Sequence, residues 1–419
     1  MKGVIYQSAM GKHKVSMLLL CVFFSFLEFK VEARKSSPLE REIEAKLKLL
    51  NKPAVKTIKS EDGDIIDCVD IYKQPAFDHP ALKNHKIQRM PSFLHESEIS
   101  STVGVFNASS DVFQTWQKSG SCPEETIPIR RIRKEDLLRA GSLDRFGRKP
   151  PEIFDNSTST MSGIVEVTNR SDAYLVAVGY NFIGGQANIN VWNPRVEKPE
   201  DFTTAQLWLK AANGDNNFES IEAGWIVNPK LYGDHRTRLF VHWTRDTYRE
   251  TGCFDLLCSG FVHTNKNIVL GGTMGPISSP GGQQYELNFA IYSDYHGKWW
   301  LKVNNNIPVG YWPAEIVRNL QHSASLVQWG GQVFSYEVKT DPPHTGTEMG
   351  SGGAAGGRFG HACYMSAVRI IDYSLKLKYP PIVGAHASEP DCYNTLNDVQ
   401  YGKDPVFYFG GAGRNPHCP

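Results

Sequence analysis

The chain has 419 residues, with 45 lysines and arginines against 44 aspartates and glutamates, and a formal net charge of +1. This length can bury a sizeable core and divide into two or three domains. The even balance of charge provides no basic surface, so no nucleic-acid partner is expected. Nine tryptophans, 17 tyrosines and 37 glycines favour many short strands and tight turns over a helical bundle.

The N-terminus has the pattern of a secretory signal. Lysines at 12 and 14 precede an apolar run over 17–27, and small residues lead up to Ala33, where a signal peptidase would cut. The run is too short to span a bilayer and no later stretch approaches that length, so no membrane span is expected. We therefore expect a secreted, extracellular protein. Three Asn-x-Ser/Thr sequons suit glycosylation in that pathway: Asn107, Asn156 and Asn169.

The cysteines predict a disulfide framework. Removal of the leader takes Cys21 away and leaves seven cysteines, which an oxidising compartment tends to pair. A Cys-x4-Cys pair without a second pair or a His-x3-His nearby is a poor zinc site, so no metal or cofactor is expected. We predict disulfides between Cys253 and Cys258 and between Cys392 and Cys418; Cys68 and Cys122 both lie in the N-terminal portion, and Cys363 is left over.

One amphipathic helix and one linker are predicted before the main strand region. Between Arg145 and Ser162 the chain becomes polar, with adjacent prolines and a Ser/Thr cluster, which is typical of an exposed linker. A domain boundary is expected there. The helix is predicted over 38–52, where apolar residues recur at the spacing of one helical face: Leu39, Ile43, Leu47 and Leu50.

Strand patterns dominate the rest of the chain. Alternating apolar residues over 285–291 and 299–303, with a turn from Asp294, predict a hairpin. A helix is expected after Pro313, and the Gly/Ser stretch over 344–360 is expected to be a mobile loop. The sum is a mainly β, antiparallel β-sandwich. Further strands are predicted at 187–192, 206–210, 221–227, 239–244, 326–333 and 364–372.

Two of these strands carry one polar side chain beside a glycine. They read I-E-A-G-W from Ile221 and W-G-G-Q-V from Trp329. Side chains alternate between faces in a strand, so Glu222 shares a face with Gly224, and Gln332 with Gly330. A bare glycine beside an acid or an amide leaves room for a substrate backbone. We therefore predict a substrate groove here, lined by Gly224, Trp225, Trp312 and Gly330.

The two strings, taken with several others in fixed order, resemble the neprosin family of plant glutamic peptidases from about residue 40 to the end. The other strings include C-P-E-E-T-I-P-I-R-R from Cys122, T-G-C-F-D-L-L-C-S-G from Thr251, and G-R-N-P-H-C-P at the C-terminus. The resemblance implies a zymogen that cleaves after proline at acidic pH. It also implies a signal peptide over 1–33, an activation propeptide over 34–150 that inhibits its own enzyme, and a β-sandwich peptidase domain over 160–419.

The resemblance further implies that Glu222 is one of two catalytic glutamates. The second position holds Gln332, a departure from the family pattern. Amide hydrolysis needs a base for water and a donor for the oxyanion, so we predict Glu222 as the base and the Gln332 amide as the donor. The substrate would be a proline-containing peptide or protein. The alternative function is a non-catalytic β-sandwich that binds cell-wall polysaccharide or peptide.

The sequence context disfavours two other nucleophile arrangements. Ser351 with His344 lacks the G-x-S-x-G turn of a serine hydrolase and lies in a glycine-rich stretch. Cys363 with His361 could supply a thiolate, but a buried or unpaired thiol is the more common state of a lone cysteine.

Overall fold

The computed structural model describes residues 37–92, 108–153, 169–212, 217–294, 296–304, 306–339 and 342–419. The chain divides into two units, residues 1–42 and 43–419. The described part of the first unit is the beginning of helix α2 (Pro38–Leu50), where Glu40 N donates to Ser37 Oγ and the Glu40 carboxylate accepts from Ser37 N. This reciprocal pair is a capping box, which fixes the helix start. Among the described residues, no helix has the length and apolar character needed to cross a membrane.

The N-terminal part of the second unit contains a small antiparallel sheet in the order β1-β2-β4. A disulfide between Cys68 on β2 and Cys122 just before β4 closes it, with Cα atoms 5.4 Å apart. The elements of this region are β1 (Ala54–Lys59), β2 (Ile65–Asp70), β3 (Phe113–Gln114), β4 (Thr126–Arg130) and α3 (Lys134–Arg139), with 3-10 turns at Ile71–Lys73, Pro75–Asp78, Pro80–Leu82 and Thr115–Ser119.

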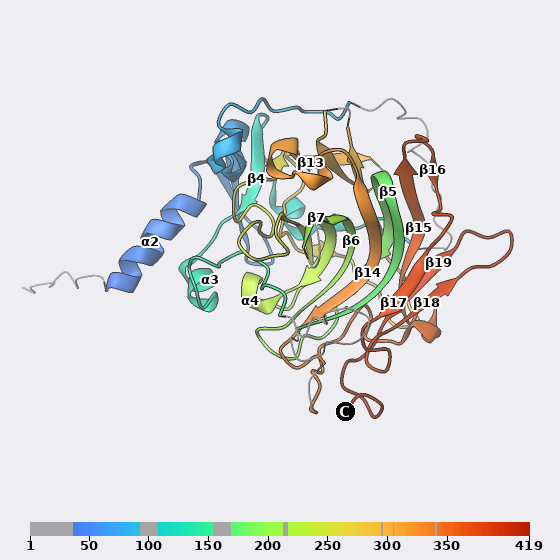
Figure 1. Cartoon of the computed structure of the whole chain (residues 1–419). Coiled ribbons are helices and arrows are strands. Elements are labelled where there is room, and N and C mark those ends of the chain that lie inside the picture. Colours follow the sequence, from blue (N-terminus) through green and yellow to red (C-terminus); the bar gives the residue numbers. More distant parts are fainter. Residues whose placement is uncertain are drawn as a thin grey trace, which may run out of the picture. The chain divides into compact units, whose positions relative to one another are not determined.

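A large antiparallel sheet forms the body of the second unit, with strands in the order β8-β7-β6-β14-β5-β11-β12-β13-β9 over the described residues. Figure 1 shows β7, β6, β14 and β5 running side by side. The bounds are β5 (Arg170–Asn190), β6 (Phe202–Ala212), β7 (Phe218–Val227), α4 (Pro229–Tyr232), β8 (Arg238–Thr244), β9 (Val262–His263), β10 (Met274–Gly275), β11 (Glu286–Ser293), β12 (Trp299–Val303), β13 (Ile307–Trp312) and β14 (Ala324–Phe334).

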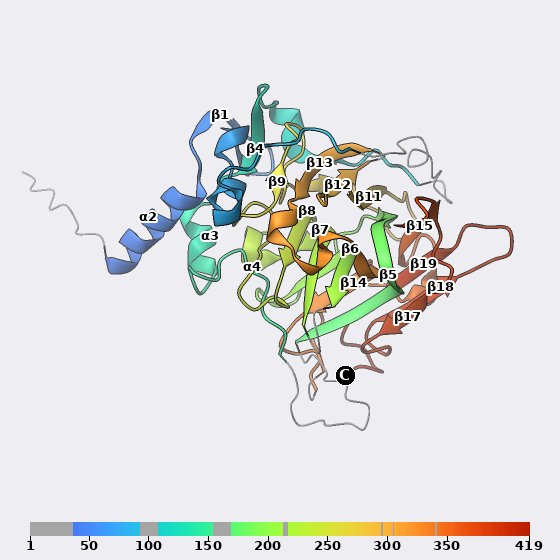
Figure 2. The same ribbon diagram turned by 45° about the horizontal axis from the view of Figure 1, so that its top comes forward.

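Strand β5 connects two layers of this sheet. Its first half pairs with β14 and β17, and its second half pairs with β11 and β15. Inward side chains of β5, β6, β7 and β14 meet those of β11, β12 and β13 in one hydrophobic core, and Figure 2 shows β11, β12 and β13 as neighbouring strands. This is the expected mainly β sandwich. The remaining strands are β15 (Cys363–Asp372), β16 (Leu377–Lys378), β17 (Gly384–Ala387), β18 (Asn394–Asp398) and β19 (Val406–Gly410).

The predicted strands and hairpin are confirmed, whereas the predicted helix after Pro313 is wrong. Two separate 3-10 turns, Ala314–Ile316 and Asn319–Gln321, replace it, because Val317 between them is extended. The buried carboxylate of Glu219 fixes the second turn by accepting backbone N–H groups, with distances of 2.7–3.1 Å from those of Asn319 and Leu320. A side chain far away in the sequence therefore overrides the local helical pattern.

The Gly/Ser stretch forms no strand or α-helix, as expected, and has a single 3-10 turn at Ala355–Gly357. It is nevertheless anchored, because Thr345 and Thr347 both donate hydroxyl hydrogen bonds to the Asp201 carboxylate, at 2.8 and 2.6 Å. The two predicted disulfides are confirmed: Cys253–Cys258 and Cys392–Cys418 have Cα separations of 5.9 and 5.3 Å, and Cys363 is a free, buried thiol.

Candidate active site

The candidate site lies on the face of β6, β7 and β14 that points away from the central core. The register brings three rows of residues into line across these strands, and each row points to that face. The predicted face-sharing of Glu222 with Gly224 and of Gln332 with Gly330 is therefore confirmed. The rows are Glu222–Trp208–Gln328, then Gly224–Gln206–Gly330, then Ile226–Thr204–Gln332.

The two glycines serve the close approach of neighbouring strands, which corrects the expectation that they make room for a substrate. A Cβ atom at Gly224 would lie 2.1 Å from the carbonyl oxygen of Ala205, and one at Gly330 would lie 2.1 Å from that of Ala173. Any side chain at these positions would clash with backbone. Gln206 lies between the two glycines in the same row.

Glu222 is fully buried, and four side-chain donors fill its carboxylate. Ser220 Oγ and Tyr248 OH donate to Oε1, at 2.8 and 2.5 Å. Gln206 Nε2 and Lys149 Nζ donate to Oε2, at 2.7 and 3.0 Å. An ionised carboxylate has about four lone-pair sites. The carboxylate therefore has no free position for a water molecule in this structure.

The charge of Lys149 keeps Glu222 ionised although both side chains are buried. Burial alone would raise the pKa of Glu222, but the positive charge of Lys149 and the hydrogen bond from Tyr248 hold this pKa well below its ordinary value. A buried charge is tolerated only when it is paired and hydrogen-bonded. In this buried environment, each of the two charges, on Glu222 and on Lys149, is stabilised mainly by the other.

Lys149 belongs to a strap, residues 147–152, that lies over the site. The Gly147 carbonyl accepts from Phe254 N at 2.8 Å, and the Pro150 carbonyl accepts from the guanidinium of Arg170. The Pro151 carbonyl accepts from Asn169 Nδ2 at 2.8 Å. These contacts on both sides of Lys149 place its ammonium group on the carboxylate. The strap falls at the end of the predicted propeptide, whose boundary was expected near residue 150.

Gln332 does not contact Glu222 in this structure. Its Nε2 donates to Asp172 Oδ1 at 2.7 Å, and its buried Oε1 has no hydrogen-bond partner among the described residues. The glycine row separates the row of Gln332 from that of Glu222. The amide that does contact Glu222 is Gln206, which the sequence analysis missed. Alternation could have placed Gln206 on a polar face, but only the strand register shows which residue it faces.

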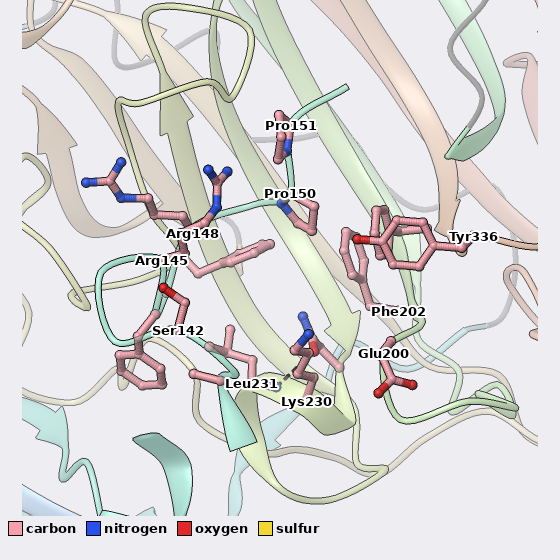
Figure 3. A pocket seen from close by; sticks show the side chains of 16 residues that line it. Ser142, Arg145, Arg148, Pro150, Pro151, Glu200, Phe202, Lys230, Leu231 and Tyr336 are labelled. Atoms are coloured by element: carbon pink, nitrogen blue, oxygen red, sulfur yellow. Dashed lines mark hydrogen bonds between the residues drawn. The ribbon is translucent and has the colours of Figure 1, made fainter. Parts of the chain in front are cut away.

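A pocket of about 220 Å³ lies beside the strap on the same face (Figure 3). Phe202 and Phe334 both line it and stack, with ring centroids 5.0 Å apart and an interplanar angle of 9°. In Figure 3, Pro150 and Pro151 lie toward the top of the pocket, and Phe202 and Tyr336 lie next to each other on its right. The charged side chains in the lining are Arg145, Arg148, Lys230 and Glu200.

Trp225 and Trp312 do not line this groove, which corrects the expectation. Both are fully buried in the central core. Trp225 is one residue from Gly224 and so points to the opposite face of β7, where its Nε1 donates to the Asn190 carbonyl at 2.9 Å. Trp312 packs edge-on against Phe261, with centroids 4.9 Å apart.

The disfavoured nucleophiles have structural roles. Ser351 donates its hydroxyl to the carbonyl of His361, and His344 pairs with Glu389 at 3.4 Å. Burial raises the pKa of the Cys363 thiol well above its ordinary value, which makes it a poor nucleophile. His344 also lies near the sulfurs of Cys392 and Cys418, but these are joined in a disulfide.

Of the three sequons, Asn107 and Asn156 lie outside the described residues. Asn169 is 2% exposed and its Nδ2, the atom that would carry a glycan, donates to the strap. That atom is therefore not presented to solvent in this structure. The predicted signal peptide over 1–33 also lies outside the described residues.

Comparison with known families gives two matches that together cover most of the chain. The family model described as Neprosin matches residues 199–412, and the one described as Neprosin activation peptide matches residues 57–178. Among solved structures, scytalido-glutamic peptidase with a peptide-based transition-state analogue is 12% identical, with a TM-score of 0.31, and covers 57% of this chain and 97% of that chain. SCP-B, a member of the Eqolisin family of peptidases in complex with the tripeptide Ala-Ile-His, is 11% identical, with a TM-score of 0.30 and the same coverage.

Proposed function

The chain belongs to the neprosin family, and from this premise we propose that it is the latent precursor of a secreted glutamic endopeptidase whose base is Glu222. The observation that carries the proposal is the saturation of the Glu222 carboxylate by four donors, one of which, Lys149, comes from the strap. The other three donors, Gln206, Ser220 and Tyr248, belong to the β-domain, by which we mean the part of the chain from β5 onward. Removal of the strap would free one lone-pair position on Oε2 and leave the carboxylate held in place.

In the proposed reaction, a water molecule takes the position that Lys149 Nζ occupies in the precursor. Glu222 accepts a proton from this water as the oxygen attacks the peptide carbonyl. Amide N–H groups donate to the oxyanion that develops, a role we assign to Gln332 Nε2. Because an amide does not readily give up a proton, the protonated Glu222 then delivers its proton to the leaving nitrogen.

Acidic conditions favour release of the strap. The pKa of Glu222 is depressed in the precursor because Lys149 is bound to it. Because strap binding lowers the pKa of Glu222, the ionised carboxylate favours the strap-bound state at pH values above the ordinary pKa of 4.5. This contribution to the free energy of strap binding is lost progressively as the pH falls below that value. Release of Lys149 is therefore coupled to uptake of a proton at the site. This supports activation in acid.

We assign proline recognition to the pocket beside the strap. Pro150 and Pro151 of the precursor line this pocket together with the aromatic side chains Phe202, Phe334 and Tyr336. Flat aromatic rings provide a large apolar surface for a proline ring at little cost in conformational entropy. The substrate would be a proline-containing peptide or protein, with the chain's own propeptide as its inhibitor.

The test is hydrolysis of a proline-containing peptide by the acid-processed protein. Wild type should cleave it and Glu222→Gln should be inactive, whereas Glu250→Gln, at an exposed glutamate, should match wild type. Activity that survives in Glu222→Gln would remove this residue from the mechanism.

A second function, a non-catalytic protein that binds peptide or polysaccharide on the same face, is favoured by one observation. The Gln332 amide donates its hydrogen bond to Asp172 and does not point toward the Glu222 carboxylate. Processed wild type that binds the peptide, leaves it intact and has an open site would support this second function.

A further inference from the structure

His242 lies directly across from Glu222 and takes no part in the mechanism proposed above. The two residues are register partners on β8 and β7, and Nδ1 of the imidazole is 3.8 Å from Glu222 Oε1. His242 is 1% exposed, and neither ring nitrogen has a hydrogen-bond partner among the described residues. Burying a polar group without a partner is costly. This cost suggests that the protein has another state, in which the imidazole has a polar partner.

The groups around the imidazole explain why it is unpaired in the precursor. Glu222 faces it from β7, Lys149 from the strap and Arg170 from β5. Tyr248 covers it from the loop after β8, with ring centroids 5.4 Å apart. Burial, reinforced by Lys149 and Arg170 and only partly opposed by Glu222, lowers the pKa of His242 to about 3. The ring is therefore neutral while Lys149 is in place.

We propose that His242 is a positioning residue that replaces Lys149 as the cationic partner of Glu222 once the strap has left. This inference rests on the proposed function. Nδ1 is already within ion-pair distance of Oε1 at 3.8 Å, so the protonated ring can pair with the carboxylate while Ser220 and Tyr248 keep their hydrogen bonds to Oε1 and the vacated position on Oε2 stays open for water. The proton comes from solvent and binds to a ring nitrogen, while the carboxylate stays ionised. One cation then substitutes for another, and the site keeps its net charge.

The exchange gives acid a direct role in activation. While the strap is bound, the imidazole of His242 is neutral. Once the strap has left, the Glu222 carboxylate no longer pairs with Lys149, and the imidazole beside it binds a proton more readily. The released state therefore binds more protons, and lowering the pH shifts the equilibrium toward release. For this one group the shift is at most about tenfold for each pH unit, in the window between its ordinary pKa of 6.5 and about 3. Glu152, on the strap and 3.9 Å from Arg170, leaves the site together with Lys149.

The pairing also allows Glu222 to work as a base in acid. An imidazolium beside a carboxylate favours the ionised carboxylate, as Lys149 does in the precursor. Without His242, the processed enzyme would have Glu222 buried beside Ser220, Tyr248 and Gln206, which are neutral donors. Burial would then raise the pKa of Glu222 and protonate the base at the pH where the enzyme is expected to act.

The experiment is an NMR titration of the histidine ring signals in the full-length protein. His242→Gln identifies the signal of His242. In wild type this signal should remain that of a neutral ring down to about pH 4, and Lys149→Arg, which keeps the cation, should behave in the same way. In Lys149→Met the proton affinity of His242 should rise at least 100-fold, seen as a midpoint at least about two pH units higher. Equal midpoints in wild type and Lys149→Met would overturn the proposal.

Two further measurements keep the outcome interpretable. If Lys149→Met does not fold, Lys149→Gln provides a neutral side chain that can still donate to Glu222, and the same midpoint shift is expected. In the acid-processed enzyme, His242→Gln should lose kcat at acidic pH with KM unchanged, because the base becomes protonated. If the ratio of the kcat of His242→Gln to that of wild type is the same at every pH, the positioning role is contradicted. A processed wild type without activity would refute the proposed function, while the NMR titration would still decide whether His242 and Glu222 pair.

Discussion

Two glutamates of the same strand show how position decides the role of a buried acid. Glu219 and Glu222 are both buried on β7. Because they are three residues apart, their side chains point to opposite faces of the strand. Glu219 accepts backbone N–H groups of a 3-10 turn, including that of Asn319 at 2.7 Å, and so stabilises the fold. Glu222 accepts only from side chains, and one of them, Lys149, comes from a segment that processing can remove. A carboxylate whose partner is removable is suited to chemistry.

At the same scale, Gln332→Glu should raise peptidase activity at acidic pH. The new carboxylic acid could give a proton to the leaving nitrogen, which an amide cannot do readily. The neighbouring Asp172 carboxylate, 2.7 Å from the amide in wild type, would keep this acid protonated to higher pH through like-charge repulsion. The measurement is kcat of the processed enzyme against pH, with the exposed Gln321→Glu as the control.

The reverse outcomes for Gln332 are equally informative. Lower activity in Gln332→Glu than in wild type would show that the neutral amide is the required donor. Activity in the variant together with none in wild type would identify the natural protein as a peptidase fold that has lost its catalytic acid.

At the scale of the elements, the period of the strands was predictable and their register was not. Alternation placed Glu222 and Gln332 on the faces that the structure shows. The same rule places Trp225 on the core face, so its assignment to the groove was avoidable. Gln206 and Lys149 were not predictable, because their contacts with Glu222 depend on which strands pair and on where the strap crosses them.

The glycine row gives a prediction about stability. Gly330→Ala should lower the free energy of unfolding by about 1–3 kcal/mol, the usual cost of overpacking, because its Cβ would lie 2.1 Å from the Ala173 carbonyl oxygen. Denaturant unfolding monitored by tryptophan fluorescence measures this loss. Gly356→Ala is the matched control, since a Cβ there meets nothing within 4 Å. Equal losses in the two variants would contradict the close approach of strands at Gly330.

At the scale of the whole molecule, the N-terminal region and the β-domain belong to one compact unit over residues 43–419. Arg238 of β8 forms a buried ion pair with Asp64, at 2.6 Å, and the Gln74 amide bonds to the backbone of His263. One end of the site's face is covered by apolar side chains of the N-terminal region, among them Ile43 and Phe146. Packing thus covers one end of the face, whereas the Glu222 carboxylate itself is blocked by Lys149.

Acid treatment of the purified precursor should shorten it. Incubation below about pH 4.5, the ordinary pKa of a glutamate, should weaken the contact between strap and sheet and permit cleavage near residue 150, whereas incubation at neutral pH should leave the mass unchanged. Intact-mass spectrometry over time follows the change. If the cleavage is autocatalytic, Glu222→Gln will stay full length. A wild-type precursor that keeps its mass at low pH would count against activation by this route.

The contact between Lys149 and Glu222 is the centre of this account, and full-length Lys149→Met tests it most directly. The measurement is hydrolysis of a proline-containing peptide by the unprocessed variant, with its intact mass checked before and after the assay. Lys149→Met should cleave the peptide without loss of the propeptide, because one position on the carboxylate becomes free for water, whereas Lys149→Arg should stay as latent as wild type. An unprocessed Lys149→Met that folds and remains as inactive as wild type, although its processed form is active, would contradict the role assigned to Lys149.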